Sequence, residues 1–296
     1  MELLTGISIE AWFDERIRPL VRFDPESCCA SSWGSAASGL EDHELDMIED
    51  RMRRSEGAPA RTALTILVGW RAGYLASMIA LGLLRDGVLV EPSRVRMLRS
   101  PDGWCADARL DDGARALVAA DHPWSSRADV VTMPDEAALE AEAVAAIGRA
   151  CAPIVDLLAC RAGRARAGMW AQVADGLGNA ALALAQAEPQ TPPCRIVRAT
   201  ERLLRAPGAP WKHVPRLWTA EAGGEPVLVK QRRSCCLSYR CDPTVSEQPA
   251  LELPEPAFLA RFGNEPPHYC DTCPFRSPSD VEARALFKAA RARVPT

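Results

Sequence analysis

Residues 64–84 read LTILVGWRAGYLASMIALGLL, a nearly continuous apolar stretch that locates the core of the protein. A helix that crosses a membrane needs about 20 apolar residues. Arg71 interrupts this stretch, and the clean apolar run extends only from Ala72 to Leu84. We therefore expect a helix buried in the core of a globular protein, with a break near Gly69–Gly73 because glycine weakens helices.

Helical and hairpin patterns lie on both sides of this stretch. The segment Glu41–Arg54 carries acids early and arginines late, which suits the helix dipole, and its apolar residues share one face. Turn residues between short apolar runs indicate two hairpins, at Val95–Leu110 and at Pro215–Lys230. We expect further helices over Asp135–Ala150, from Pro153 through Met169-Trp170 to Leu184 with a kink or break at its glycines, over Ile196–Leu204, and over Asp280–Arg293 after the cap Ser279.

These patterns predict an α+β fold that is predominantly helical with small antiparallel β-hairpins. Residues 1–230 are expected to form a mostly helical body with β-hairpins. Residues 231–296 form a cysteine-rich C-terminal segment, which we expect to pack on the body as one domain. The Pro-rich stretch Asp242–Pro267 within that segment is expected to be an irregular loop.

Composition excludes several functional classes. The chain has 296 residues, a formal net charge of −4, 48% hydrophobic and 25% charged residues. These values are typical of a soluble globular protein and not of a disordered one or a basic nucleic-acid binder. We therefore expect no nucleic-acid partner, and peripheral membrane contact is left open. The N-terminal residues have no basic start and no uninterrupted apolar core, so we expect a cytoplasmic protein without a secretory signal.

The cysteines suggest metal or redox chemistry. There are eleven, and an odd number argues against a closed disulfide framework. Cys235 and Cys236 are adjacent, and Cys270 and Cys273 form a C-x-x-C, a spacing that lets a turn direct two thiolates at one metal centre. Four thiolates can hold either zinc or an iron–sulfur cluster. Neighbouring side chains of an extended backbone point to opposite faces, which favours two separate irons over one zinc ion.

The run Arg-Arg-Ser-Cys-Cys-Leu at 232–237, followed by the C-x-x-C, resembles the FhuF-like ferric siderophore reductases. The signature of that family is C-C-x10-C-x2-C, and its cysteines hold a [2Fe–2S] cluster. The resemblance implies that Cys235, Cys236, Cys270 and Cys273 are the cluster ligands. It is specific in the last quarter of the chain, and upstream the segment Met169–Ala174 also looks like a helical segment of the family.

The chain departs from the family pattern in the spacing of the two pairs. Residues 237–269 separate them, where the family has about ten, and Cys241 adds a fifth thiol nearby. Loop closure entropy grows only logarithmically, so the longer loop costs about 1 kcal/mol. Cys241 could replace one of the adjacent pair as a ligand.

The implied function is one-electron reduction of ferric iron in siderophore complexes, with release of iron(II) in the cytoplasm. The implied partners are a ferric siderophore, hydroxamate or similar, and an external electron donor such as a ferredoxin or an NAD(P)H-dependent reductase. Gly-rich phosphate-binding motifs are absent, which agrees with an external donor. Arg232, Arg233 and Arg240 would favour the reduced, more negative cluster, or would simply form a solvated face. The resemblance identifies no catalytic side chain.

Two other functions remain open at this point: a zinc-stabilised four-cysteine interaction protein, and a siderophore-binding protein of the same family that does not reduce iron. His268 could contact a cluster sulfur or replace a ligand, and is otherwise a loop residue. Cys28 and Cys29 form a second adjacent pair without a C-x-x-C partner nearby, which favours buried thiols. Most of the eight Trp residues are expected in the core, although one or two could line a siderophore pocket.

Overall fold

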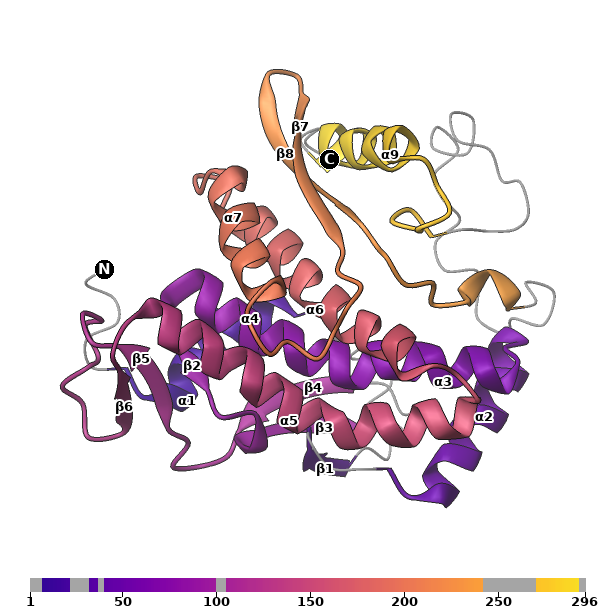
Figure 1. The fold of residues 1–296 in the computed structure, drawn as a ribbon, viewed down its shortest axis with the longest axis horizontal. Coiled ribbons are helices and arrows are strands. Elements are labelled where there is room, and N and C mark those ends of the chain that lie inside the picture. The colour runs from indigo at the N-terminus through magenta and orange to yellow at the C-terminus, as the bar shows by residue number, and fades with distance from the viewer. Residues whose placement is uncertain (1–6, 22–31, 37–39, 100–104, 242–269, 293–296) are drawn as a thin grey trace.

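The computed structural model describes residues 7–21, 32–36, 40–99, 105–241 and 270–292 (Figure 1). The described part is an α+β structure in which helices predominate, as the sequence predicts. The predicted Pro-rich loop, His268 and the Cys28–Cys29 pair lie outside the described residues.

The apolar stretch forms the central helix of the protein. It consists of α3 (Ala60–Val68), a π-helical turn η5 (Gly69–Gly73) and α4 (Tyr74–Asp86). The π-helical turn occupies the position where the glycines predict a break. A Cβ atom at Gly176 of the neighbouring helix would lie 2.2 Å from the carbonyl oxygen of Gly73, so glycine is needed where the two helices meet.

Four helices surround this central helix, and three short elements precede them. The four are α2 (Asp42–Glu56), α5 (Glu136–Ala162), α6 (Arg166–Ala187) and α7 (Pro193–Leu204). The N-terminal elements are α1 (Ile9–Trp12), a π-helical turn (Phe13–Ile17) and a 3-10 turn (Arg18–Leu20). In α2 the predicted apolar face, Leu45, Ile48 and Met52, is buried in the core. This confirms the amphipathic pattern of that segment.

The prediction that Pro153 begins a new helix is wrong. Pro153 lies inside the single helix α5, although proline removes one helical hydrogen bond and crowds the preceding turn. Apolar residues on both sides of it, including Ile147, Cys151, Ile154 and Leu158, are buried along one face. Their burial keeps the helix continuous, and it ends at Gly163, whose φ of 56° is left-handed. The predicted break among the glycines is therefore located between α5 and α6.

Three small sheets complete the fold. Antiparallel strands β1 (Ser32–Ser35), β3 (Val95–Arg99) and β4 (Cys105–Leu110) form one sheet, in the order β1-β3-β4. A second sheet has the order β2-β5-β6, from β2 (Leu89–Val90), β5 (Ala116–Ala119) and β6 (Val130–Met133). Its β5–β6 pair is parallel, which the hairpin pattern did not predict. A 3-10 turn at Pro92–Arg94 separates β2 from β3.

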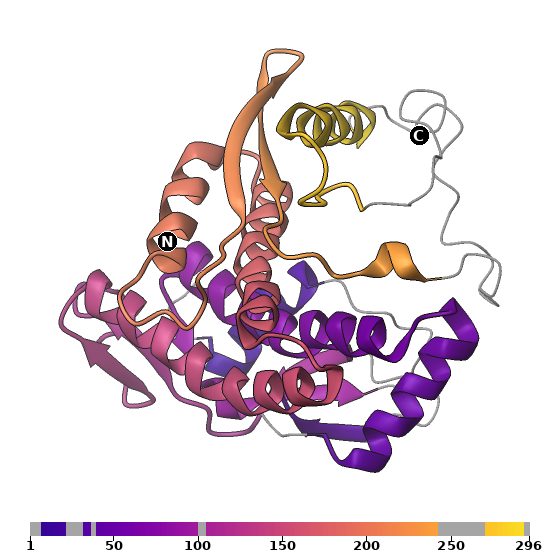
Figure 2. The same ribbon diagram turned by 45° about the vertical axis from the view of Figure 1, so that its right-hand side comes forward.

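The third sheet is the second predicted hairpin and carries the last helix. Strands β7 (Arg216–Ala222) and β8 (Glu225–Gln231) are antiparallel and joined by Gly223 and Gly224, both with positive φ. The last helix α9 (Pro278–Ala292) packs beside the hairpin, away from the helical body (Figures 1 and 2). The indole nitrogen of Trp218 donates a hydrogen bond to Glu282 at 2.8 Å.

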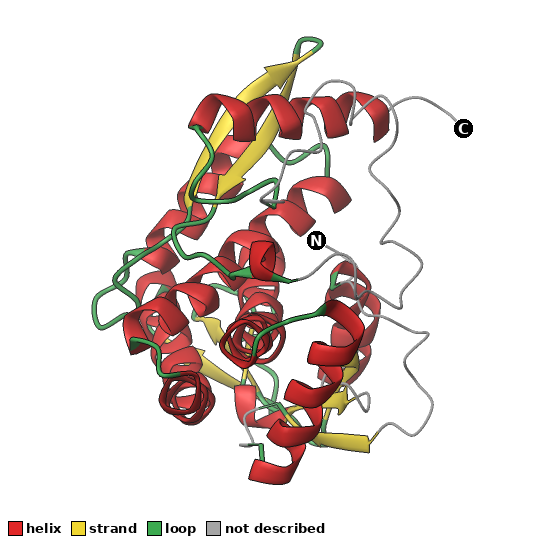
Figure 3. Ribbon diagram, turned by 90° about the vertical axis from the view of Figure 1, so that its right-hand side faces the viewer, coloured by secondary structure: helices red, strands yellow, loops and turns green. Residues whose placement is uncertain are grey.

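Two helices are long and apolar enough to cross a membrane by length and composition alone: Ala60–Asp86 and Glu136–Ala162. Of the most apolar window of the first, 78% is buried inside the protein, and of the second 50%. The first is therefore the core helix that the sequence predicts. Figure 3 shows that helices make up most of the body.

Candidate metal centre

The candidate centre lies where the chain leaves β8 and meets the C-x-x-C segment. The backbone N–H of Arg232 donates to the carbonyl of Thr272 at 2.8 Å. The side-chain amide of Gln231 donates to the carbonyl of Arg276 at 2.8 Å. The two cysteine pairs, which are far apart in the sequence, are thus carried by segments that are hydrogen-bonded to each other.

The C-x-x-C segment forms a tight turn, as its spacing predicts. The N–H of Cys273 donates to the carbonyl of Cys270 at 3.0 Å. The guanidinium of Arg276 donates to that same carbonyl at 2.9 Å, and its backbone N–H donates to the carbonyl of Cys273. Cys273 is buried, with 2% of its surface exposed, and Cys270 is half-buried.

The adjacent pair is followed by an unusual backbone conformation. Leu237 has a φ of 66°, and it is the one described residue other than glycine with a positive φ. This conformation is strained for a residue with a Cβ atom. It directs the N–H of Leu237 to the sulfur of Cys235 at 3.3 Å, while the hydroxyl of Ser238 lies 3.1 Å from the sulfur of Cys236. Ser238–Arg240 then form the 3-10 turn η7.

The thiols of the two pairs interact directly. The Cys236 thiol donates to Cys270, and this bond together with burial raises the pKa of Cys236. The Cys270 thiol in turn donates to Cys273 and lowers the pKa of Cys273 to about 7. Burial raises the pKa of Cys235, whose thiol also lies close enough to Cys236 to affect it electrostatically. All four predicted ligands therefore lie in one neighbourhood.

The four thiols are a donor set that fits a group bound by four thiolates. They are not arranged around a single metal ion. Within residues 7–21, 32–36, 40–99, 105–241 and 270–292, no group of three or more His, Cys, Asp or Glu side chains could hold a metal ion. What supports a cluster is thus the kind of donor and the contact between Cys236 and Cys270, which joins the two pairs.

Arg232 lies beside the thiols, but it is already paired. Its guanidinium forms an ion pair with Asp175 of α6 at 2.5 Å and a hydrogen bond with Gln172. Burial opposes its charged form, yet Asp175 and then the thiols of Cys236 and Cys270 raise the pKa of Arg232. Arg233 and Arg240, the other two predicted cations, are exposed.

Arg164 is a cation that the sequence did not single out. It lies between α5 and α6 and donates from Nη2 to the carbonyl of Cys235 at 2.9 Å. Burial lowers the pKa of Arg164, and the nearby Cys235 partly offsets this effect. Its Nη1 is buried without a hydrogen-bond partner among the described residues. The only signal for Arg164 in the sequence is its position in the basic connection after Gly163.

Helix α6 holds the adjacent pair in place. The Gln172 amide donates to the hydroxyl of Ser234, which donates to the carbonyl of Gly168, both at 2.9 Å. Gln172 belongs to the segment Met169–Ala174 near the start of α6. This segment therefore contacts the chain immediately before Cys235.

Of the remaining described cysteines, Cys241 lies near these contacts and the others lie elsewhere in the protein. Cys241 follows the turn η7 and lies partly buried against the core, so its role as a substitute ligand stays a prediction. Cys105 and Cys151 are buried, and burial raises the pKa of each to about 12, as expected of core thiols. Cys160 and Cys194 are exposed.

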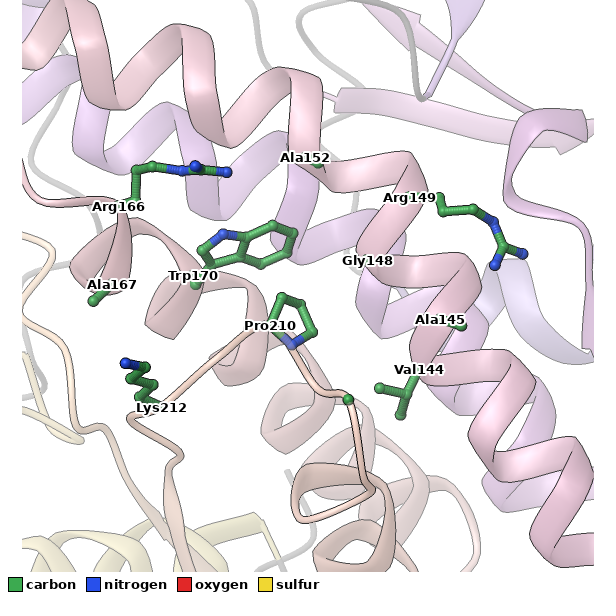
Figure 4. Close-up of a pocket in the computed structure, with 11 residues that line it drawn as sticks. Val144, Ala145, Gly148, Arg149, Ala152, Arg166, Ala167, Trp170, Pro210 and Lys212 are labelled. Atoms are coloured by element: carbon green, nitrogen blue, oxygen red, sulfur yellow. The ribbon is translucent and has the colours of Figure 1, made fainter.

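A hollow of about 540 Å³ lies on the other side of the first turn of α6. Trp170 lies between α5 and α6 in this hollow, with Pro210 facing it (Figure 4). The basic side chains that line the hollow are Arg149, Arg166 and Lys212.

Comparison of the chain with models of protein families, with curated proteins and with solved structures finds no match. The function of this protein has to be inferred from the site, because a fold does not by itself define an activity.

Proposed function

Starting from four cysteine thiols gathered beside α6, we propose that this protein reduces ferric iron in siderophore complexes. A [2Fe–2S] cluster would be held by Cys235, Cys236, Cys270 and Cys273. When bound, such a cluster supplies a centre that accepts and donates one electron. The FhuF-like sequence pattern and the donor set both favour this function over a structural zinc site.

The observation that carries the proposal is the contact between Cys236 and Cys270. These residues are separated by the long segment 237–269, yet their thiols lie close enough that each changes the pKa of the other. Unrelated thiols scattered through a chain have no reason to meet in this way. The backbone bond from Arg232 to Thr272 holds the two segments in the same register.

The protein's own groups around the thiols suit an anionic centre. The N–H of Leu237 and the hydroxyl of Ser238 approach two of the sulfurs. Arg164 and Arg232 lie close enough to interact electrostatically with Cys235, Cys236 or Cys270. Hydrogen bonds to sulfur and nearby positive charge favour the reduced form and raise the reduction potential.

In the proposed reaction one electron from an external donor, a ferredoxin or an NAD(P)H-dependent reductase, converts iron(III) to iron(II). The siderophore ligands themselves are unchanged. Iron(II) is a weaker Lewis acid, so the hard oxygen ligands hold it less tightly and it is released. We propose that this takes place in the cytoplasm.

The test is metal and sulfide analysis of the protein purified without oxygen, together with its absorption spectrum. We expect two irons and two sulfides per chain, as a [2Fe–2S] cluster requires, and visible bands that bleach with dithionite. A colourless protein with stoichiometric zinc would refute the proposal.

Single substitutions to serine then identify the ligands. Cys235→Ser, Cys236→Ser, Cys270→Ser and Cys273→Ser should each lose or alter the visible bands. Cys194→Ser is the matched control, because Cys194 is exposed on α7 and should leave the bands unchanged. If Cys241→Ser loses the bands while Cys235→Ser keeps them, the ligand assignment is wrong.

A further inference from the structure

We propose that the hollow between α5 and α6 binds the ferric siderophore, and that it selects complexes with a net negative charge over neutral ones. This inference rests on the proposed function and adds the substrate site and substrate class. Its volume of about 540 Å³ is in the range of small-molecule sites, roughly 300–1,000 Å³.

Small residues on α5 create the space. Ala145, Gly148 and Ala152 line the hollow, and their spacing of three and four residues places them on one face of the helix. Larger side chains at these positions would fill it. The opposite wall includes Trp170 of α6, which faces Pro210 in Figure 4 and is buried, with 6% of its surface exposed.

The lining is positively charged. Arg149, Arg166 and Lys212 are exposed at the hollow, and no acidic side chain is among the residues that line it. Arg149 pairs with Glu142 and Arg166 with Asp156, each at 2.6 Å. Surface pairs of this kind contribute little and leave the arginines able to reorient.

Two features add to this charge. Within the described part of the chain, Lys212 has no carboxylate within ion-pair distance. The first residues of α6, Arg166 and Ala167, also line the hollow, so the positive end of this long helix faces it. Together these groups give the hollow an excess of positive charge, and the rest of its lining is largely apolar.

The hollow is also close to the thiols. Arg166 and Ala167 lie in the first turn of α6, and the carbonyl of Gly168 in that turn accepts the hydrogen bond from Ser234. Arg164, just before the helix, contacts the carbonyl of Cys235. The bound chelate and the thiol centre would therefore be separated by about the width of one helix, roughly 10–12 Å.

The charge of the lining determines the class of chelate. Three hydroxamates neutralise a ferric ion and give an uncharged complex. Three catecholates carry twice that charge and leave the complex strongly negative, with aromatic rings on its outside. The positive charge of the lining therefore matches the catecholate class better.

Binding can be measured without electron transfer by using gallium(III), which has the size and charge of iron(III) and is not reduced. We would measure the affinity of the full-length protein, as purified, for a gallium tris-catecholate and for a gallium trihydroxamate of similar size. We expect the tris-catecholate to bind at least about tenfold more tightly, since tenfold corresponds to 1.4 kcal/mol.

The variant R166A/K212A should lose about tenfold or more in affinity for the tris-catecholate and change little for the trihydroxamate. Both side chains are exposed, so the fold should be retained, and circular dichroism checks this. R115A is the control, because Arg115 is an exposed arginine that does not line the hollow.

Equal affinity of wild-type protein for the two gallium complexes would overturn the proposed selectivity. Unchanged affinity of R166A/K212A for the tris-catecholate would overturn the site. Neither result depends on the metal content of the protein. Conversely, if the protein contains zinc in place of iron and sulfide, the reductase function is refuted. The binding measurements would still show whether the hollow is the chelate site.

Discussion

Arg71 is a buried cation whose guanidinium has no hydrogen-bond partner within the described part of the chain, and its removal should stabilise the protein. It lies in the π-helical turn η5 with 1% of its surface exposed. None of its three guanidinium nitrogens has a hydrogen-bond partner among the described residues. Burial, and then the nearby Arg99, lower its pKa from 12.5 to about 10. This depression reports how strongly the folded protein disfavours the charged form.

The size of the effect follows from the pKa shift. One pKa unit corresponds to 1.36 kcal/mol, so the shift amounts to roughly 3 kcal/mol. Arg71→Met keeps most of the side-chain volume and removes the charge. We therefore expect Arg71→Met to raise the free energy of unfolding by about 1–3 kcal/mol at neutral pH, in the range seen when buried charges are replaced by apolar residues. Urea unfolding followed by circular dichroism measures this change.

The pH dependence gives a second check. Because the pKa of Arg71 is lower in the folded state, the unfolded chain binds more protons from about pH 10 up to the ordinary pKa of arginine. Stability attributable to Arg71 therefore rises with pH in that window, and the rise should be missing in Arg71→Met.

Arg161→Met is the matched control, since Arg161 is paired with Asp46 and Glu49 and should give no gain. A loss of more than about 2 kcal/mol in Arg71→Met would refute the reasoning, because it would mean that the guanidinium has a partner in the folded protein.

Three further predictions concern the thiol centre and the helix contact. Leu237→Gly should raise the unfolding free energy by about 1 kcal/mol, because glycine adopts the positive φ without strain, whereas Leu237→Ala should give no such gain in urea unfolding. Gly176→Ala should lower the melting temperature markedly, because its Cβ would lie 2.2 Å from the carbonyl of Gly73; Gly69→Ala, where the nearest atom is 4.0 Å away, should have little effect. In the iron-loaded protein, Arg164→Gln should lower the reduction potential measured by dithionite titration more than Arg233→Gln does; equal shifts would show that Arg164 has no special effect.

Local patterns in the sequence predicted most of the elements. The face of α2, the break at Gly69–Gly73 and the Gly223–Gly224 turn depend on residues close together in the chain. The parallel pairing of β5 with β6 joins separate segments through backbone bonds, and no side-chain pattern specifies it. The prediction of a helix start at Pro153 failed for a related reason. The local preference of proline was outweighed by the burial of the apolar residues around it in the folded protein.

The candidate metal centre also combines features that the sequence predicted with features that it did not. Cysteine spacing predicted the turn at Cys270–Cys273, because a C-x-x-C turn is a local feature. The charges around the thiols were harder to predict. Arg232 was expected to favour the reduced cluster or to lie on a solvated face, and in the structure it pairs with Asp175, which is distant in the sequence. Arg164 contacts a backbone carbonyl of Cys235, and such a contact leaves no sequence signal.

This difference changes which residue sets the electrostatics of the centre. An arginine paired with a buried carboxylate contributes little net charge at a distance, so Arg232 and Asp175 together act mainly to position the chain before Cys235. Arg164 has no carboxylate partner among the described residues and lies against Cys235. Arg164, in the connection between α5 and α6, therefore adds positive charge next to Cys235 that no described carboxylate offsets. That connection also leads into the turn that lines the hollow, so one short segment contacts both the proposed electron-transfer centre and the proposed substrate site.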